Sequence, residues 1–190
     1  MPRKPEFDRD DLINRARDLF WARGWAGTSL KDLEEGLKVK PGSFYAAFGS
    51  KDALFGLALE RYFEDGQENL RTLAGQHGPL GALQALPDQI VRNSGAPAKA
   101  CMLSKTFLEL QSRDHPLAEQ ANAHLLDMEA SFADLFREAQ SQGLIAATHD
   151  PTQLARRYQS DLLGLRVSAE RPGVDAAAIA DEIATGLSRL

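Results

Sequence analysis

The residues best suited to chemistry lie between Lys38 and Phe55, in the stretch KVKPGSFYAAFGSKDALF. Its ammonium groups, a serine hydroxyl and a tyrosine phenol can all donate hydrogen bonds to phosphate oxygens. Small residues leave room for close approach, and an alanine methyl can touch the methyl group of thymine. This combination favours contact with a nucleic acid over catalysis.

Enzyme chemistry finds little support elsewhere in the chain. No histidine has a second histidine or a cysteine at a spacing that suits a metal, and the chain contains no H-E-x-x-H, G-x-S-x-G or glycine-rich phosphate loop. We therefore expect no catalytic residues, no metal and no cofactor. The four histidines are His77, His115, His124 and His149.

Composition limits the class of protein. The chain has 190 residues, of which 43% are hydrophobic and 26% charged, as is usual for a soluble protein. The net charge is -5, but residues 1–51 hold 10 Lys and Arg against 8 Asp and Glu, whereas residues 52–190 hold 12 against 19. The single Cys101 excludes an internal disulfide. Without a signal-like start or a long apolar run, we expect a cytoplasmic protein that does not enter a membrane.

The periodicity is helical throughout, and no strand alternation is visible. Asp8 or Asp10 is expected to cap a first helix that Gly24 ends, and Thr28 or Ser29 a short second one. A short helix from Pro41 and a long one capped by Ser50 follow. A Gly, Pro and His-rich linker is expected over residues 75–81, and further helices over residues 80–93, 100–113, 116–142, 151–170 and 175–190. These elements predict an all-α fold with a small trihelical unit followed by a larger helical body.

The second and third helices have the layout of a helix-turn-helix, in which the second of the pair enters the major groove of DNA. Phe44 and Phe48 are four residues apart and should anchor the third helix on its inner side. Lys51 would stand in the first turn of the next helix, where a cation suits the helix dipole poorly but suits a nearby phosphate.

The joint pattern TSLKDLEEGLKVKPGSFYAAFGSKDALF resembles the N-terminal region of the TetR/AcrR family of transcriptional regulators. Two positions depart from that pattern. The family usually has glycine in the turn, where this chain has Lys38. Either the lysine must accept a positive φ or the turn must reshape, at a cost of about 1 kcal/mol, and Gly36 could share that strain. Lys40 replaces the usual Ser or Thr cap of the third helix.

The resemblance implies a helix-turn-helix DNA-binding domain over residues 1–50 and a helical ligand-binding and dimerisation domain over residues 51–190. It implies a homodimeric repressor, bound to double-stranded operator DNA and released by a small effector whose identity the sequence does not give. Phosphate contacts would come from Thr28, Tyr45 and Lys51, and base-edge or groove contacts from Lys40, Pro41, Gly42, Ser43 and Ala46.

Candidates for the effector pocket are residues of the middle helices, although each of them could simply fill the core. They are Leu59, Tyr62, Phe63, Cys101, Met102, Thr106, Phe107, Met128, Phe132 and Phe136. Cys101 stands at a predicted helix start beside Lys99, which favours a thiolate, yet a lone cysteine also serves as a small buried hydrophobe.

Dimer contacts are expected from the last two helices, as the resemblance implies a four-helix bundle between subunits. The candidate residues are Leu154, Tyr158, Leu162, Leu165, Ile179, Ile183 and Leu187. The alternative is that these faces pack on their own subunit. For the whole chain, the alternative is a helical ligand-binding or protein-interaction module without specific DNA binding, and the salt dependence of DNA affinity separates the two.

Overall fold

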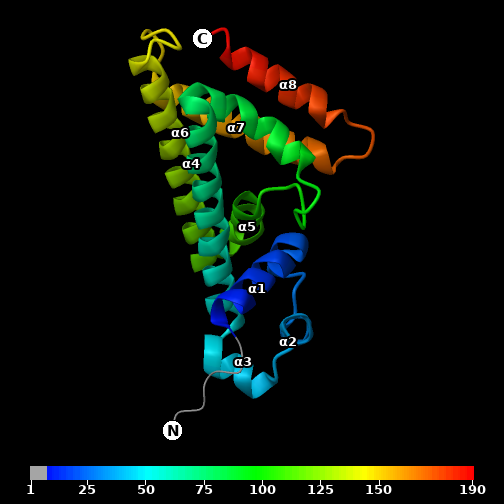
Figure 1. Cartoon of the computed structure of the whole chain (residues 1–190). Coiled ribbons are helices and arrows are strands. Elements are labelled where there is room, and N and C mark those ends of the chain that lie inside the picture. The colour runs from blue at the N-terminus through cyan, green and yellow to red at the C-terminus, as the bar shows by residue number, and fades with distance from the viewer. Residues whose placement is uncertain (1–7) are drawn as a thin grey trace.

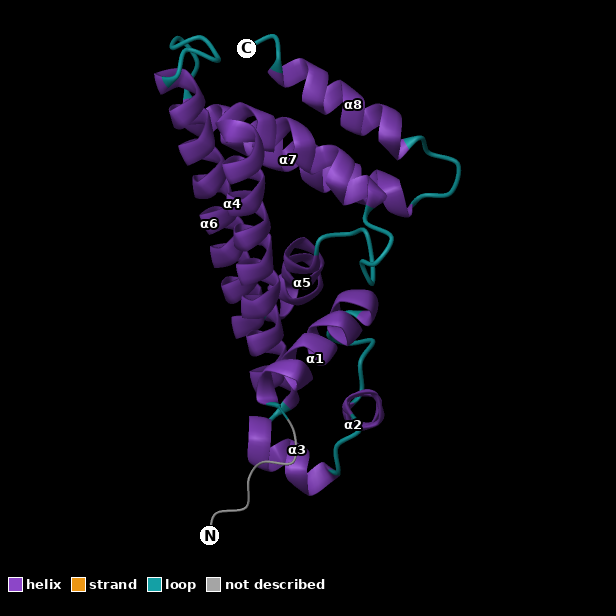
Figure 2. Cartoon of the chain, in the orientation of Figure 1, coloured by secondary structure: helices purple, strands orange, loops and turns teal. Residues whose placement is uncertain are grey.

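The computed structural model describes residues 8–190, and every regular element in that part of the chain is helical (Figure 2). The prediction of an all-α fold is confirmed. No helix of the described residues has the length and apolarity needed to cross a membrane. The helices are α1 (Arg9–Arg23), α2 (Leu30–Leu37), α3 (Pro41–Phe48), α4 (Lys51–Arg92), α5 (Met102–Leu110), the 3-10 turn η1 (Gln111–Arg113), α6 (Pro116–Ser141), α7 (Pro151–Glu170) and α8 (Ala176–Leu187).

The helices are arranged along two long ones (Figure 1). α4 and α6 pack side by side, with α1, α2 and α3 gathered at one end of the pair. α7 and α8 cross the other end, and α5 packs against α6 in the space between the two groups. The small N-terminal unit and the C-terminal pair therefore lie at opposite ends of the molecule.

Side-chain caps set several helix starts where the sequence predicts them. The Asp8 carboxylate accepts from the backbone N–H of Asp10, and the Ser50 hydroxyl accepts from that of Ala53 at 3.0 Å. Ser29 and Asp32 form a reciprocal capping box at the start of α2. These bonds satisfy backbone donors that have no partner inside the helix.

The prediction of a linker over residues 75–81 is wrong. Only Gly78 leaves the helical conformation, with φ 72° and ψ 177°, and helix continues on both sides of it within α4. Proline fits the first position of a helix, so Pro79 can restart the helix directly after the break. The Gly and Pro content therefore produces a kink rather than a loop.

The buried side chains form two clusters. The first joins α1, α2 and α3 to the beginning of α4 and to α5 and α6, with Phe20, Phe44 and Phe55 fully buried. The second joins the end of α4 to α6, α7 and α8, around Phe136 and Tyr158. Since the first cluster takes members from both sides of Ser50, the N-terminal helices are anchored directly on the helical body.

Candidate nucleic-acid interface and ligand cavity

The turn between α2 and α3 is a Schellman motif closed by a lysine. Lys38 adopts the left-handed conformation, with φ 58° and ψ 41°. Its N–H donates to the Glu35 carbonyl at 3.3 Å, and the N–H of Val39 donates to that of Glu34 at 3.0 Å. Val39 is buried, as the hydrophobic position of this motif requires. The turn thus keeps the geometry that glycine usually provides.

Gly36 has a different role from the one the sequence suggested. A Cβ atom at this position would lie 2.5 Å from Cδ1 of Leu19, so glycine permits the close packing of α2 on α1. The Gly36 carbonyl also accepts from the Arg15 guanidinium at 2.6 Å. Gly36 therefore takes no share of the strain, and Lys38 carries the positive φ alone.

The third helix has a buried face and an exposed face. Phe44 and Phe48 are buried, with their ring centroids 5.8 Å apart, which confirms them as inner anchors. The exposed face carries six residues, namely Pro41, Gly42, Ser43, Tyr45, Ala46 and Ala47. Tyr45 packs edge-on against Phe44 and keeps 51% of its surface exposed. A Cβ atom at Gly42 would meet no protein atom within 4 Å. This surface is small, polar at one end and open to close approach.

Thr28 does not belong to this surface. Its side chain is fully buried, and its hydroxyl donates to the Gly24 carbonyl at 2.8 Å. The expectation of a phosphate contact from the Thr28 hydroxyl is therefore wrong. The residue closes the turn between α1 and α2, and Ser29 beside it makes the exposed cap.

Lys51 lies over the ring of Trp25, with Nζ 4.3 Å from the ring centroid. The Trp25 indole N–H donates to the Asp52 carboxylate at 2.7 Å, which fixes the ring under the ammonium group. Partial burial lowers the pKa of Lys51, and the carboxylates of Asp52 and Glu109 oppose that shift. The Trp25 ring thus holds the Lys51 ammonium at the start of α4, close to the end of α3.

Two side chains of α5 hold the end of α1. Lys105 Nζ donates to the Trp21 carbonyl at 2.7 Å. The Glu109 carboxylate accepts from the backbone N–H groups of Trp25 and Ala26 at 3.0 and 2.7 Å. Helical periodicity in the sequence gives no signal for these contacts, because they join segments more than 80 residues apart.

A cavity of about 500 Å³ lies between α1, the middle of α4, the loop before α5, and helices α6 and α7. Five of the ten predicted pocket residues line it, namely Tyr62, Phe63, Cys101, Met128 and Phe132. The sequence missed the contributions of α1 and α7, chiefly Arg17, Trp21 and Arg166. No local pattern marks these residues, because segments far apart in the sequence meet to form the cavity.

The other five predicted pocket residues do not line this cavity. Leu59 and Phe136 are fully buried in the two core clusters, and Phe107 packs against the first. Met102 is buried in the first cluster, and the Thr106 hydroxyl donates to the Met102 carbonyl at 2.9 Å. For these five the alternative holds, and they fill the core.

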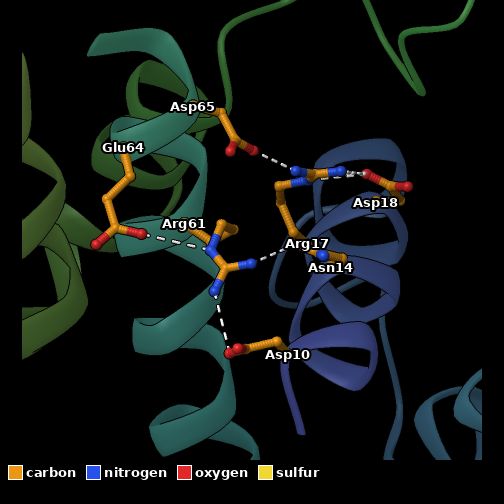
Figure 3. A network of polar contacts seen from close by, with 7 residues as sticks. All are labelled: Asp10, Asn14, Arg17, Asp18, Arg61, Glu64 and Asp65. Carbon is orange, nitrogen blue, oxygen red and sulfur yellow. Dashed lines mark hydrogen bonds and ion pairs between the residues drawn. The ribbon is translucent and has the colours of Figure 1, made fainter. Parts of the chain in front are cut away.

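Polar side chains join α1 to α4 (Figure 3). Arg17 pairs with Asp18 on its own helix and with Asp65 on α4. Arg61 donates to Asn14 at 2.7 Å and to Asp10 at 3.2 Å. Arg17, Asp18 and Asp65 belong to the cavity lining, so this part of the network borders the cavity as well as linking the two helices.

The predicted dimer residues pack on their own subunit. Tyr158, Leu162, Leu165 and Leu187 are buried in the second core cluster, so the prediction is wrong for these four. Leu154, Ile179 and Ile183 are half-buried against the same cluster. Amphipathic spacing identified the inner faces of α7 and α8, whereas a partner would have to meet the outer faces.

Two protein-family models match this chain. The family model described as "Bacterial regulatory proteins, tetR family" matches residues 12–58. A second, described as "Tetracyclin repressor-like, C-terminal domain", matches residues 79–178. The two matches cover the helix-turn-helix and most of the helical body.

Similar sequences and structures include regulators. The HTH-type transcriptional repressor ComR of Escherichia coli (strain K12) is 27% identical over 175 residues, covering 86% of this chain and 80% of ComR. The uncharacterized HTH-type transcriptional regulator YezE of Bacillus subtilis (strain 168) is 29% identical over 176 residues, or 90% of each chain. Among solved structures, a cysteine mutant of the TetR family regulator CifR with 26-bp operator DNA is 30% identical, with a TM-score of 0.81 over 97% of this chain and 98% of CifR.

Proposed function

Because this chain belongs to the tetR family of bacterial regulatory proteins, we propose that it is a DNA-binding transcriptional regulator, a repressor that a small ligand releases from its operator. The observation that carries the proposal is the exposed face of α3. Two buried phenylalanines hold that face outward, and six small or polar residues cover it. Such a helix can enter the major groove, where base edges are read.

The proposed contacts follow the surface. Tyr45 and Lys51 donate to phosphates, while Pro41, Gly42, Ser43 and Ala46 approach the groove, with Lys40 at the exposed start of the helix. Phosphate contacts position the helix and groove contacts read the sequence. The structure of CifR with operator DNA supports DNA binding by a chain of this fold.

We propose the same division of labour that the resemblance implied, with residues 1–50 for DNA and residues 51–190 for ligand and partner. A homodimer would place two copies of α3 about 34–36 Å apart, or a multiple of that helical repeat, on a near-palindromic operator. The outer faces of α7 and α8 suit the dimer contact. Val167 is 57% exposed on α7, and Gly164 on α7 and Ala178 on α8 are exposed small residues.

The route from ligand to DNA runs through α1 and α5. α1 supplies part of the cavity wall, so a ligand would contact the DNA-binding unit directly. Cys101 lines the cavity at the start of α5, while Lys105 and Glu109 of the same helix hold the end of α1. A ligand that prefers one placement of α1 would shift the spacing of the two α3 helices. α5 thus joins α4, which runs from Lys51 beside the DNA-binding unit into the helical body, as a second path from the cavity to α3.

Fluorescence anisotropy with DNA from upstream of its own gene tests the proposal, at two salt concentrations and with unrelated DNA as competitor. Tyr45→Phe should weaken operator binding at least about tenfold, since a hydrogen bond to a charged group is worth about 1.5–3 kcal/mol. Lys51→Met should reduce the slope of log affinity against log salt by about 0.9 for each phosphate that the lysine neutralises.

The matched control is Lys31→Met, which removes an exposed lysine of α2 that pairs with Glu35 at 3.8 Å. This variant should bind like the parent. Unchanged affinity in both Tyr45→Phe and Lys51→Met would contradict the proposed surface. If no fragment in a genomic selection bound better than unrelated DNA, the chain would instead be a ligand-binding module without specific DNA binding.

A further inference from the structure

The cavity has an apolar interior. Aromatic side chains from three helices face it, including Trp21, Tyr62, Phe63 and Phe132, together with aliphatic residues such as Leu125 and Leu162. Its volume of about 500 Å³ lies in the range of cavities that hold a small organic molecule. Apolar walls of this kind bind the hydrocarbon part of a ligand and leave its polar part to a few placed groups.

Most polar groups of the lining already have partners inside the protein. Arg17 is shared between Asp18 and Asp65, and Asn69 exchanges two hydrogen bonds with Gln89 at 2.7 and 3.0 Å. The Gln159 amide donates to the Leu125 carbonyl at 2.9 Å. The Asn93 amide oxygen accepts from the Gly95 N–H, and the Trp21 indole N–H donates to the Ala100 carbonyl. These groups stabilise the walls and have reduced capacity to select a ligand.

Arg166 is the exception. Its Nη1 donates to the Lys99 carbonyl at 3.1 Å, and no carboxylate of residues 8–190 forms an ion pair with it. A guanidinium has five N–H donors, so most of its donors remain available. Glu170, one turn further along α7, is committed elsewhere, since its Oε1 accepts from the N–H groups of Lys99 and Ala100 at 2.5 and 2.9 Å.

Tyr62 lines the same cavity as Arg166 and is within reach of its charge. Burial is the main cause that raises the pKa of the Tyr62 phenol, and Arg166 acts in the opposite direction. Cys101 lies beside the same phenol. Both Tyr62 and Arg166 line the cavity, so a cationic fork and a neutral hydroxyl belong to one lining whose other charged groups, Arg17, Asp18 and Asp65, are paired with one another.

We infer that the ligand of this cavity is an organic carboxylate with an apolar body, its carboxylate bound by Arg166 and its body enclosed by the aromatic walls. A planar fork matches a carboxylate with two parallel hydrogen bonds, and the low polarity around it strengthens the pair. The role of this ligand as effector rests on the proposed function, whereas its binding to the cavity does not. Ligand binding itself is measured without DNA.

The test is calorimetry of the DNA-free protein with compounds that share a body and differ in charge, namely phenylbutyrate, phenylbutyramide and phenylbutylamine. Octanoate and octanamide provide a second body. At least one carboxylate should bind, its amide should bind at least about tenfold more weakly, and the amine should be weakest. Quenching of tryptophan emission in a Trp25→Phe background, where Trp21 of the cavity wall is the remaining tryptophan, should follow the same order.

Arg166→Met should remove the preference for carboxylate over amide, while Arg166→Lys should keep part of it because the charge remains. Arg157→Met, an exposed position on the same helix, is the matched control and should bind like the parent. Far-ultraviolet circular dichroism checks that the variants fold. If Arg166→Met does not fold, two measurements still test the inference. They are the binding of both compounds to Arg166→Lys, and the comparison of carboxylate with amide on the parent protein.

Three results would overturn the inference: equal binding of carboxylate and amide, a preference for the amine, or an unchanged preference in Arg166→Met. The absence of binding by either carboxylate at millimolar concentration would also overturn it. Operator titrations with and without the carboxylate separate this inference from the proposed function. Carboxylate binding that leaves operator affinity unchanged would contradict the effector role alone, whereas operator binding without carboxylate binding would contradict the ligand class alone.

Discussion

Replacing Lys38 by glycine should stabilise the helix-turn-helix. At φ 58° and ψ 41°, a residue with a Cβ atom costs about 1–2 kcal/mol, a cost that glycine avoids. Glycine also gives the unfolded chain more freedom, which offsets about 0.4–1 kcal/mol. Lys38 is exposed, and its side chain makes no ion pair within residues 8–190, so little else changes. Subtracting the midpoints of these two ranges gives an expected net gain of about 0.8 kcal/mol in the free energy of unfolding.

Native-state hydrogen exchange is the suitable assay, because it reports the free energy of opening for the amides of α2 separately from the rest of the protein. The buried Leu33 and Leu37 give the reporters. Lys38→Ala is the control, since it removes the same charge and keeps the strained conformation. If Lys38→Gly protects α2 no better than Lys38→Ala does, the assignment of strain to this turn is refuted.

Three further changes have defined outcomes. Glu109→Gln leaves one acceptor oxygen for two backbone donors, so it should cost about 1 kcal/mol in stability and speed amide exchange in the turn between α1 and α2. Unchanged exchange would contradict the conclusion that Glu109 of α5 holds the end of α1. Tyr158→Phe removes the buried bond to the Leu83 carbonyl at 2.6 Å and should cost about 1 kcal/mol in urea unfolding without weakening the dimer, while dimer loss would return Tyr158 to the interface. Hydrogen bonds from Ser29 lower the pKa of Asp32 from 3.8. The cap therefore stabilises α2 above that pH, and its contribution is lost as the pH falls through the pKa of Asp32 in the folded protein. Asp32→Asn should reduce this loss of amide protection in α2 at acid pH.

The sequence alone determined the features that depend on neighbouring residues. Asp8, Ser29 and Ser50 cap helices through bonds that span two or three residues, and Phe44 and Phe48 share a face because they are one turn apart. The resemblance left either a positive φ at Lys38 or a reshaped turn, and the structure shows the positive φ. The family resemblance rests on the same local motifs, and the family matches confirm it.

The tertiary structure decided what each buried face packs against. Periodicity marked the inner faces of α7 and α8 correctly as apolar, but only the fold shows that Tyr158 and Leu165 cover their own subunit. Thr28 is a residue type that often caps helices at the surface, yet the packing of α1 on α2 buries it. Only the fold brings Arg17 and Arg166 to one cavity, because they lie on helices nearly 150 residues apart in the sequence and no local pattern encodes such a meeting. A hydrophobic face specifies that it must be covered, and only the three-dimensional arrangement specifies what covers it.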